Sequence, residues 1–339
     1  MSDKASTPSN APALSVAMSV YNGEQFLAPA IESILAQTFT DFEFLILDDG
    51  SQDATADIVR SYAAKDSRIR PIIRENKGLI VSLNQLLAEA RAPIVARMDA
   101  DDISLPARFA RQLQFLAEHP EIGVVGTWSQ DTDENDNHYV CDGEEHPVHH
   151  DEFLRNMRDG GPLFCHPAVM YRRDLVLGVG GYHAAFKHCE DLDLWLRLAS
   201  VTRLANIPER HFIYRHYLGQ VSKRHATEQQ VGAAIAYEAY RCRRDGKPDP
   251  TEELDSLPPI EQLDALFGET GVAVRVRRKV VAGGIIHSPS ALRDQGFEIL
   301  LRYLREGGSH AGMWRTVLRL LRLGEPLRAL RLSAALATS

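Results

Sequence analysis

The sequence predicts an α/β fold, a mostly parallel sheet flanked by helices, with a helical C-terminal extension. Short apolar runs typical of strands alternate with helical segments of about ten residues over the first 127 residues. Two of these runs end in acidic turns, Asp48-Asp49 and residues 99–102. In a parallel sheet such turns meet at the C-terminal edge, which is where open α/β sheets bind ligands.

The elements follow from hydrophobic patterning. Strands are expected at residues 14–20, 43–47, 69–73, 92–97 and 122–127, and helices at residues 24–37, 54–64, 79–91 and 106–118. Asn22 and Gln25 resemble a capping box, and Asp53 is placed to cap the second helix. Residues 128–151 predict a solvated loop, with a metal site at His146, His149 and His150 as the alternative. Residues 162–171 predict another strand, and residues 192–198 a helix that is apolar on most sides.

Length and charge set the outer limits. The chain has 339 residues, which corresponds to one large domain or two ordinary ones, and its net charge of −8 argues against a general nucleic-acid binder. The charge is uneven, because residues 271–339 contain 12 Lys and Arg but only 4 Asp and Glu. A basic end on an acidic body suggests a separate role for the tail.

The sequence also predicts a cytoplasmic location. Its four cysteines, Cys141, Cys165, Cys189 and Cys242, form no C-x-x-C pair and fit a reducing compartment. Residues 1–12 predict a disordered leader without the apolar region of a signal peptide. No run of 18 uninterrupted apolar residues occurs, so no membrane span is expected.

The C-terminal part predicts helices. These are expected at residues 226–244, 259–267, 290–305 and 313–323, with a breaker at residues 245–250. Around Trp314, apolar residues intermix with Arg315, Arg319 and Arg322, which share one helical face, and Arg328 and Arg331 follow Pro326. Residues 313–331 therefore predict either peripheral contact with an anionic membrane or a packed helix with a solvated basic face.

The acidic turn after residues 92–97 is the central candidate site. Asp99, Asp101 and Asp102 repel one another unless a cation lies between them. Carboxylates are hard ligands that suit Mg²⁺ or Mn²⁺, which often bind together with substrate phosphates. The hypothesis is a divalent metal that holds a diphosphate. The alternative is an acidic surface turn that caps the next helix.

Two further acidic pairs are candidates. Asp48 and Asp49 could accept hydrogen bonds from a base or ribose, or they could simply form a turn. Neither a G-x-G-x-x-G after the first strand nor a P-loop motif is present.

Glu190 and Asp191 begin a buried helix. They could supply a general base, or they could only complement the helix dipole.

Five segments together resemble family 2 glycosyltransferases. They are residues 16–23, 34–39, 47–53, 99–102 and 190–195, and the resemblance covers about residues 13–222. It implies a GT-A fold with a Rossmann-like sheet, a nucleotide-sugar donor, a divalent metal and inversion at the anomeric carbon. The expected organisation is a leader at 1–12, a GT-A domain at 13–222 and a helical extension at 223–339.

The resemblance also assigns roles to residues. It places Tyr21, Asn22 and Glu24 in the loop that meets the nucleotide, and Asp49 as the reader of the base with Asp48 beside it. Asp99 and Asp101 match the D-x-D motif, and Asp99 is also expected to contact the donor nucleotide. Asp101 is the first choice as metal ligand, with Asp99 and Asp102 as further candidates. Asp191 matches the catalytic base, and Glu190 is its neighbour.

The end of the motif departs from the family. Tyr214-Arg215 and Gln220-Val221-Ser222 resemble the end of the family domain. Where the family often has a His two residues after that Arg, this chain has Tyr217, and His216 lies one position earlier. The sequence therefore leaves open whether a histidine contacts the metal or a phosphate.

The predicted function is that of an inverting, Mn²⁺- or Mg²⁺-dependent hexosyl- or N-acetylhexosaminyltransferase. Its donor would be a nucleotide-sugar, UDP-linked by resemblance. Its acceptor would be a hydroxyl of a glycan or lipid-linked molecule in cell-surface polysaccharide synthesis. A nucleotidyltransferase and a catalytically silent sugar-nucleotide-binding or scaffold protein are the alternatives. The sugar, linkage and oligomeric state stay open.

Overall fold

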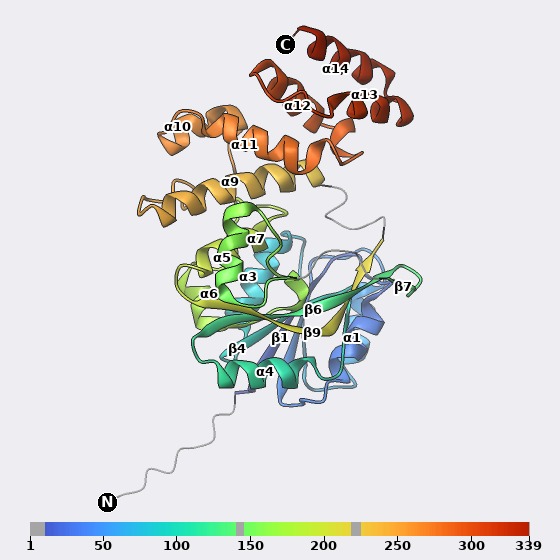
Figure 1. Cartoon of the computed structure of the whole chain (residues 1–339). Coiled ribbons are helices and arrows are strands. Elements are labelled where there is room, and N and C mark those ends of the chain that lie inside the picture. Colours follow the sequence, from blue (N-terminus) through green and yellow to red (C-terminus); the bar gives the residue numbers. More distant parts are fainter. Residues whose placement is uncertain (1–10, 140–145, 218–224, 339) are drawn as a thin grey trace, which may run out of the picture. The chain divides into compact units, whose positions relative to one another are not determined.

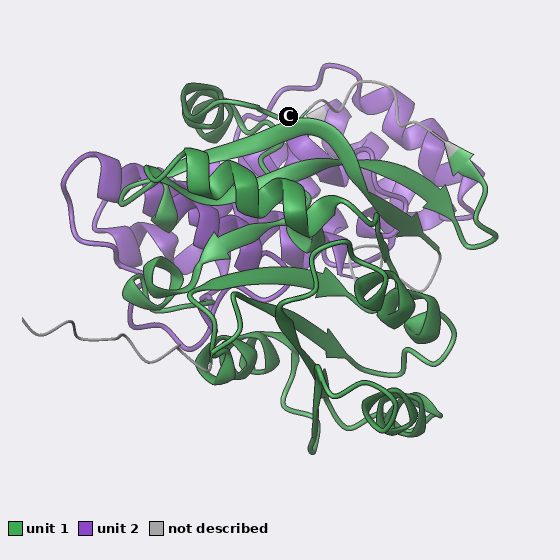
Figure 2. Cartoon of the chain, turned by 90° about the horizontal axis from the view of Figure 1, so that it is seen from below, with its two compact units in different colours: residues 1–182, 197–217 green, residues 183–196, 218–339 purple. Residues whose placement is uncertain are grey.

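The computed structural model describes residues 11–139, 146–217 and 225–338. It divides into two compact units, which are coloured separately in Figure 2. Unit 1 comprises residues 1–182 and 197–217, and unit 2 comprises residues 183–196 and 218–339. Most of the predicted leader, Cys141, the Gln220-Val221-Ser222 motif and the predicted boundary after residue 222 lie outside the described residues.

Unit 1 contains a sheet with strand order β3-β2-β1-β4-β8-β6-β9-β5, and β7 pairs with β6. The strands are β1 (Leu14–Val20), β2 (Phe42–Asp48), β3 (Ile69–Ile73), β4 (Ile94–Asp99), β5 (Ile103–Ser104), β6 (Ile122–Asp133), β7 (His138–Tyr139), β8 (Met170–Arg172) and β9 (Arg203–His216). The helices are α1 (Leu27–Leu35), α2 (Thr55–Ala63), α3 (Leu79–Glu89), α4 (Arg108–Glu118), α5 (His150–Asp159) and α6 (Arg173–Gly178) (Figure 1).

The register of the parallel strands brings the acidic turns to one edge, as predicted. β1 pairs in parallel with both β2 and β4. Val20 lies opposite Asp48 in one pair, and Ser19 lies opposite Asp99 in the other. The carboxylates after β2 and after β4 therefore flank the end of the same strand.

Both faces of the parallel part of the sheet are covered by helices, which explains why its strands are apolar on both sides. Alternate residues of β1 pack against α1, α2 and α4, and the members of that cluster include Leu14, Val16, Met18, Leu27, Ile31, Ile34, Val59 and Phe109. Helix α3 packs against β1 and β2 from the opposite side through the buried residues Leu83, Leu86 and Leu87 (Figure 1). The core thus holds β1 and its acidic neighbours rigidly.

Three local predictions are wrong. No capping box forms at Asn22, which adopts φ 50° and accepts a hydrogen bond from Gln52 instead. Residues 128–133 and 138–139 are strand rather than loop, because β6 continues along β9. In the predicted strand at 162–171, residues 166–168 form a 3₁₀ turn and only Met170–Arg172 pair in the sheet.

The three histidines of the predicted loop do not form a metal site. The His146 carbonyl accepts a hydrogen bond from Trp128, and His149 precedes α5, where Glu152 accepts its backbone N–H at 3.1 Å. The His150 ring accepts a hydrogen bond from the Leu204 backbone. Each serves local structure separately.

Unit 2 is helical in its described part, apart from turns and connections. It contains all but the last two residues of α7 (Glu190–Leu198), then α9 (Ala226–Arg244), α10 (Leu263–Phe267), α11 (Val272–Val280), α12 (Gly296–Arg305), α13 (Met313–Arg322) and α14 (Pro326–Thr338). Helix α9 packs on α11, and α14 packs on both α12 and α13. A π-helical segment (Val281–Ile285) follows α11, and Gly284 lets it approach the Gln230 side chain closely. No helix in the described part of the chain combines the length and apolar character needed to cross a bilayer.

Candidate active site

The loops after β1 and β2 hold each other through short hydrogen bonds. Asn22 donates its backbone N–H to the Ser51 hydroxyl, and its side-chain oxygen accepts the N–H of Gln52, both at 2.8 Å. Glu24 and Asp53 form a reciprocal pair in which each carboxylate accepts a backbone N–H from the other loop. The predicted residues Asn22 and Glu24 therefore shape this loop, and they leave the Tyr21 side chain half exposed at its start.

Asp49 fixes a third loop against the same edge. Its two oxygens accept the backbone N–H groups of Lys77 and Gly78 at 2.9 and 2.8 Å, and Arg74 pairs with it at 2.6 Å. Gly50 makes this approach possible, because it adopts φ +79° and a Cβ there would lie 2.6 Å from the Asn76 nitrogen. Asp49 is thus buried in a network that orders residues 74–78.

Asp48 is fully buried beside it. One of its carboxylate oxygens accepts the Ser51 N–H at 3.0 Å. No described residue donates to the other oxygen. A buried carboxylate oxygen without a partner is costly in a folded protein, so this atom is a candidate acceptor for a ligand donor.

The predicted D-x-D cluster forms at the end of β4. Asp99, Asp101 and Asp102 each place an oxygen within 4.8 Å of the other two. Asp102 is buried, and one of its oxygens accepts the backbone N–H of Arg215 at 2.8 Å. No donor among the described residues reaches its other oxygen. These carboxylates form the cluster that we call the aspartate cluster.

Burial and mutual repulsion dominate the electrostatics of the aspartate cluster. Burial, with the charge of Asp99, raises the pKa of Asp101 to about 6, although a hydrogen bond from Tyr217 acts in the opposite direction. Burial, then the charges of Asp101 and Asp99, raises the pKa of Asp102 well above its usual range. Both shifts favour the protonated, neutral forms of Asp101 and Asp102 when no cation is bound.

A divalent cation fits this donor set. Three carboxylates with an unpartnered buried oxygen match the oxygen ligands that Mg²⁺ and Mn²⁺ prefer. A cation would also offset the repulsion between the carboxylates, which adds to burial in raising the pKa values of Asp101 and Asp102. The alternative of a simple helix-capping turn is not observed, because α4 begins at Arg108 without a side-chain cap.

Two arginines that were not predicted as site residues support the aspartate cluster. Arg97 is buried within β4 and forms an ion pair with Asp99. Burial alone would lower the pKa of Arg97, but the charge of Asp99 outweighs it and raises that pKa. An arginine inside an otherwise apolar strand was the available signal. Arg215 on β9 donates to the carbonyl oxygens of Asp101 and Asp133 at 2.9 and 3.1 Å.

His216 and Tyr217, where the sequence departs from the family pattern, contact different carboxylates. The Tyr217 hydroxyl hydrogen-bonds to Asp101, and its ring centroid lies 5.2 Å from that of Phe26. His216 instead faces β6, where its Nε2 lies 2.8 Å from Asp131. Tyr217 rather than His216 therefore contacts the aspartate cluster.

Glu190 and Asp191 belong to unit 2. Both lie in the first turn of α7, where acidic side chains complement the helix dipole. Glu190 is buried and Asp191 is partly exposed. Of this pair, Asp191 is the more accessible to a substrate.

Comparison with known sequences gives a consistent family. The model of the family described as Glycosyl transferase family 2 matches residues 15–179. Putative glycosyltransferase EpsE of Bacillus subtilis is 34% identical over 243 residues, which cover 69% of this chain and 83% of that protein. O-antigen biosynthesis glycosyltransferase WbnJ of Escherichia coli is 31% identical over 238 residues, covering 68% and 85%.

Solved structures agree on the fold. A crystal structure of S. aureus TarS residues 1–349 is similar with a TM-score of 0.54 at 18% identity, covering 83% of this chain and 84% of that one. The mannosyltransferase PcManGT from Pyrobaculum calidifontis, solved with GDP-Man and Mn²⁺, gives a TM-score of 0.51 at 18% identity, covering 99% and 89%. The sheet order, the family match and these relatives together show that the chain is a glycosyltransferase of family 2 with a GT-A fold.

Proposed function

We propose that this glycosyltransferase moves a sugar, with inversion, from a nucleoside diphosphate sugar to an acceptor hydroxyl in a metal-dependent reaction. The observation that carries the proposal is the aspartate cluster at the end of β4, with three carboxylates close together and the unpartnered oxygen of Asp102. It shares a sheet edge with Asp48 and Asp49, so one ligand with a base, a ribose and a diphosphate could span both.

The nucleoside end of the donor is assigned to the loops after β1 and β2. Tyr21 supplies an exposed aromatic ring, and Asn22 and Glu24 hold its loop in place. The free oxygen of Asp48 is a suitable acceptor for a base or ribose donor, and Asp49 orders the adjacent residues 77–78. TarS has been solved with UDP and with UDP-GlcNAc, and PcManGT with GDP-Man, so UDP stays our first choice of nucleotide.

The diphosphate end is assigned to the aspartate cluster. Asp101 is our first choice as ligand of Mn²⁺ or Mg²⁺, with Asp99 and Asp102 completing the set. A cation bound there would neutralise the charge of the departing diphosphate. Arg97 and Tyr217 hold Asp99 and Asp101 in place for this task.

Asp191 is proposed as the general base, and Glu190 as its supporting neighbour. Inversion needs one displacement, in which the acceptor oxygen forms a bond to the anomeric carbon while the bond to the diphosphate breaks. The acceptor proton must then go to a nearby base, and a partly exposed carboxylate at a helix start can take it. No covalent enzyme intermediate is required.

The acceptor is proposed to be a hydroxyl of a glycan or lipid-linked molecule in cell-surface polysaccharide synthesis. Two relatives support this class by name, the O-antigen enzyme WbnJ and amylovoran biosynthesis glycosyltransferase AmsE of Erwinia amylovora. The transferred group would be a hexosyl or N-acetylhexosaminyl unit. We propose a cytoplasmic location, supported by the free cysteines Cys165, Cys189 and Cys242.

Residues 313–331 are proposed to contact the cytoplasmic face of the membrane. Helix α13 buries Met313, Val317 and Leu320. Other apolar side chains of the two last helices are exposed, namely Trp314, Leu318 and Leu321 on α13 and Leu327 and Leu330 on α14. Arg315 and Arg322 are exposed on α13 as well. Exposed apolar groups beside cationic ones fit an anionic lipid surface, where a lipid-linked acceptor would be found.

The test is calorimetric titration of the purified chain with UDP, GDP and dTDP, each with and without Mn²⁺. Metal-dependent binding of one nucleotide is expected, followed by release of that nucleotide when its sugar derivatives are screened with acceptors. Binding without turnover in a broad acceptor screen would favour the scaffold alternative. Release of pyrophosphate from a nucleoside triphosphate and a sugar phosphate would favour the nucleotidyltransferase.

A further inference from the structure

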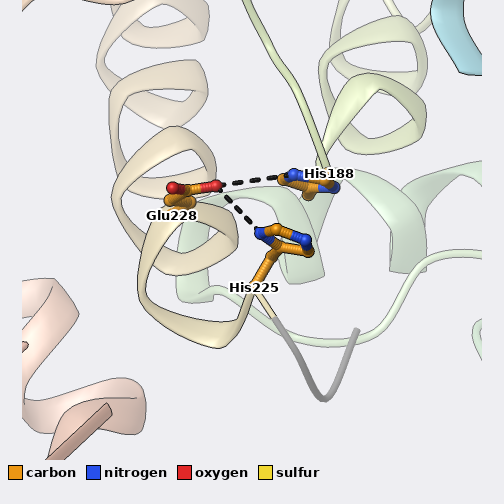
Figure 3. A group of neighbouring side chains, drawn as sticks. All are labelled: His188, His225 and Glu228. Atoms are coloured by element: carbon orange, nitrogen blue, oxygen red, sulfur yellow. Dashed lines mark hydrogen bonds and ion pairs between the residues drawn. The ribbon is translucent and has the colours of Figure 1, made fainter. Parts of the chain in front are cut away.

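Two histidines and a glutamate meet in unit 2, away from the aspartate cluster in sequence and in chemistry. His188 precedes α7, while His225 and Glu228 lie at the start of α9. Figure 3 shows one Glu228 oxygen directed at both imidazoles, 3.5 Å from His188 Nε2 and 3.2 Å from His225 Nδ1. The two rings are stacked, with centroids 4.0 Å apart and planes 11° from parallel.

These separations suit a tetrahedral metal. Zinc binds histidine nitrogen and carboxylate oxygen at about 2.0–2.2 Å, so two ligands at a tetrahedral angle lie about 3.3–3.5 Å apart. The two measured distances fall close to that value, and one ligand atom from each of the three side chains lies within 4.8 Å of the other two. Small rotations of the side chains would complete a three-ligand set.

The backbone is arranged to bring these groups together. His188 adopts φ +66°, a conformation that is uncommon for a residue with a Cβ and that often marks a functional position. His225 is the N-cap residue of α9, and Glu228 lies three residues later on the same face. Gly232 lets α9 approach the segment after His188, because a Cβ there would lie 2.5 Å from Cys189 Sγ.

The donor set of this cluster differs from that of the aspartate cluster. Two imidazoles and one carboxylate form a nitrogen-rich set, which suits a borderline ion such as Zn²⁺. The aspartate cluster offers only oxygen ligands.

We propose that His188, His225 and Glu228 bind a borderline transition-metal ion, with Zn²⁺ as the first candidate. The fourth position would be left to water. Such an ion would tie His188, two residues before α7, to the first turn of α9, and would thereby hold the start of the helix that carries Glu190 and Asp191. This positional role rests on the proposed function of Asp191, but metal binding itself does not.

The experiment measures Zn²⁺ binding to the tag-free, chelator-treated full chain in excess Mg²⁺, which occupies oxygen-only sites. We expect one Zn²⁺ per chain, retained in an Asp101→Ala variant. His188→Asn tolerates the positive φ and His225→Asn keeps a good N-cap residue, so both variants should fold. Each variant should lower the Zn²⁺ affinity at least about 100-fold, since even the mutation of a residue that only hydrogen-bonds to a metal ligand typically lowers metal affinity about 10–100-fold. Glu228→Gln should weaken it about tenfold.

His211→Asn is the matched control. His211 also pairs with a carboxylate, because its Nε2 lies 2.9 Å from Glu209. The second partner of Glu209 is Arg111 rather than another imidazole, so the His211→Asn variant should bind Zn²⁺ as tightly as the wild type. Co²⁺ should give a tetrahedral visible spectrum in the wild type that disappears in His188→Asn. The proposal is overturned if the wild type binds no Zn²⁺, or if folded His188 and His225 variants bind it as the wild type does. In either case nucleotide binding remains an independent test of the proposed function.

Discussion

The backbone N–H of Arg215 lies 2.8 Å from the carboxylate oxygen of Asp102 that accepts its hydrogen bond. This contact ties the end of β9 to the turn after β4 and fixes the buried Asp102 in one orientation. Asp101 is held differently, by the Tyr217 hydroxyl, and Asp99 by an ion pair with Arg97. The three aspartates should therefore respond differently to substitution.

Asp101→Ala should weaken Mn²⁺-dependent nucleotide binding by at least about tenfold, because the substitution removes a proposed metal ligand. The free energy of unfolding should change little. Asp102→Ala should instead also destabilise the fold by about 1–3 kcal/mol, since the buried Arg215 N–H loses its acceptor. Titration calorimetry and thermal unfolding separate the two effects. Asp57→Ala, an exposed carboxylate on α2, is the control. Unchanged metal dependence in Asp101→Ala would transfer the ligand role to Asp99 or Asp102.

The pH dependence of metal binding follows from the raised pKa of Asp101. Below about pH 6 a proton occupies the carboxylate that the metal needs, so Mn²⁺ affinity should fall by up to about tenfold for each further pH unit. Without metal, the Asp101 carboxyl contributes most to the free energy of unfolding below its pKa in the unfolded chain, and this contribution is lost as the pH rises through about 6. The gain in Tm on adding Mn²⁺ should therefore be larger at pH 7.5 than at pH 5.

Tyr217→Phe refines that test. The hydroxyl hydrogen bond lowers the pKa of Asp101, so its removal should move the fall in Mn²⁺ affinity to higher pH. Calorimetric titrations between pH 5 and pH 8 measure the midpoint in both proteins. An identical midpoint would mean that the tyrosine does not act on this carboxylate.

The donor half of the site was predictable from sequence for a physical reason. A short apolar run and an acidic turn are local signals, and the rule that parallel strands share their C-terminal edge then brings Asp48 and Asp99 together without a structure. The capping box at Asn22 failed because tertiary contact with residues 51–52 outweighed the local motif.

Asp49→Asn should weaken nucleotide binding whether or not metal is present. The amide cannot accept both N–H groups of Lys77 and Gly78 and also pair with Arg74, so the loop at 74–78 should lose order. A stability loss of about 1–3 kcal/mol is expected from one unsatisfied buried group. UDP titrations with and without Mn²⁺ distinguish this result from that of Asp101→Ala. A purely metal-dependent loss would contradict the assignment of Asp49 to the nucleoside end.

Asp191→Asn should fold and bind donor but lose about 10²–10⁴-fold in kcat, because the amide has nearly the same shape but cannot take a proton. Glu190→Gln is the informative comparison, since it tests the other carboxylate of the same helix turn. The measurement is nucleotide release at saturating donor, with thermal unfolding as a check on folding. Normal turnover in Asp191→Asn would remove it as the base, and a larger loss in Glu190→Gln would transfer the role.

The parts that sequence did not reveal depend on distant pairing. Residues 128–133 are polar and look like loop, yet they continue β6 because β9 lies alongside them in parallel. The meeting of His188 with His225 joins positions 37 residues apart whose local patterns show nothing unusual. The basic tail was predicted as an amphipathic helix, but only the structure shows that α13 buries Met313, Val317 and Leu320 and leaves Trp314, Leu318 and Leu321 exposed.

The tail should bind anionic vesicles through those side chains. Trp314 is 59% exposed, and Leu318 and Leu321 lie on the same side of α13, so the replacement of all three by Ser removes apolar area without touching the buried Met313 and Val317. Co-sedimentation with vesicles containing phosphatidylglycerol should be strong for the wild type and lost in the triple variant. Replacing Arg315 and Arg322 by Gln should weaken binding mainly at low salt, because electrostatic attraction to the surface is screened.

The same apolar side chains could instead pair two copies of the chain, and the experiment separates these outcomes. Sedimentation velocity of the wild type without lipid should show a monomer that the triple variant leaves unchanged. A dimer that dissociates in the variant, together with no vesicle binding, would mean that α13 forms a protein interface. Because α13 lies far from the aspartate cluster in sequence, donor hydrolysis in solution should be equal in both proteins, whereas transfer to a lipid-linked acceptor in vesicles should fall only in the variant.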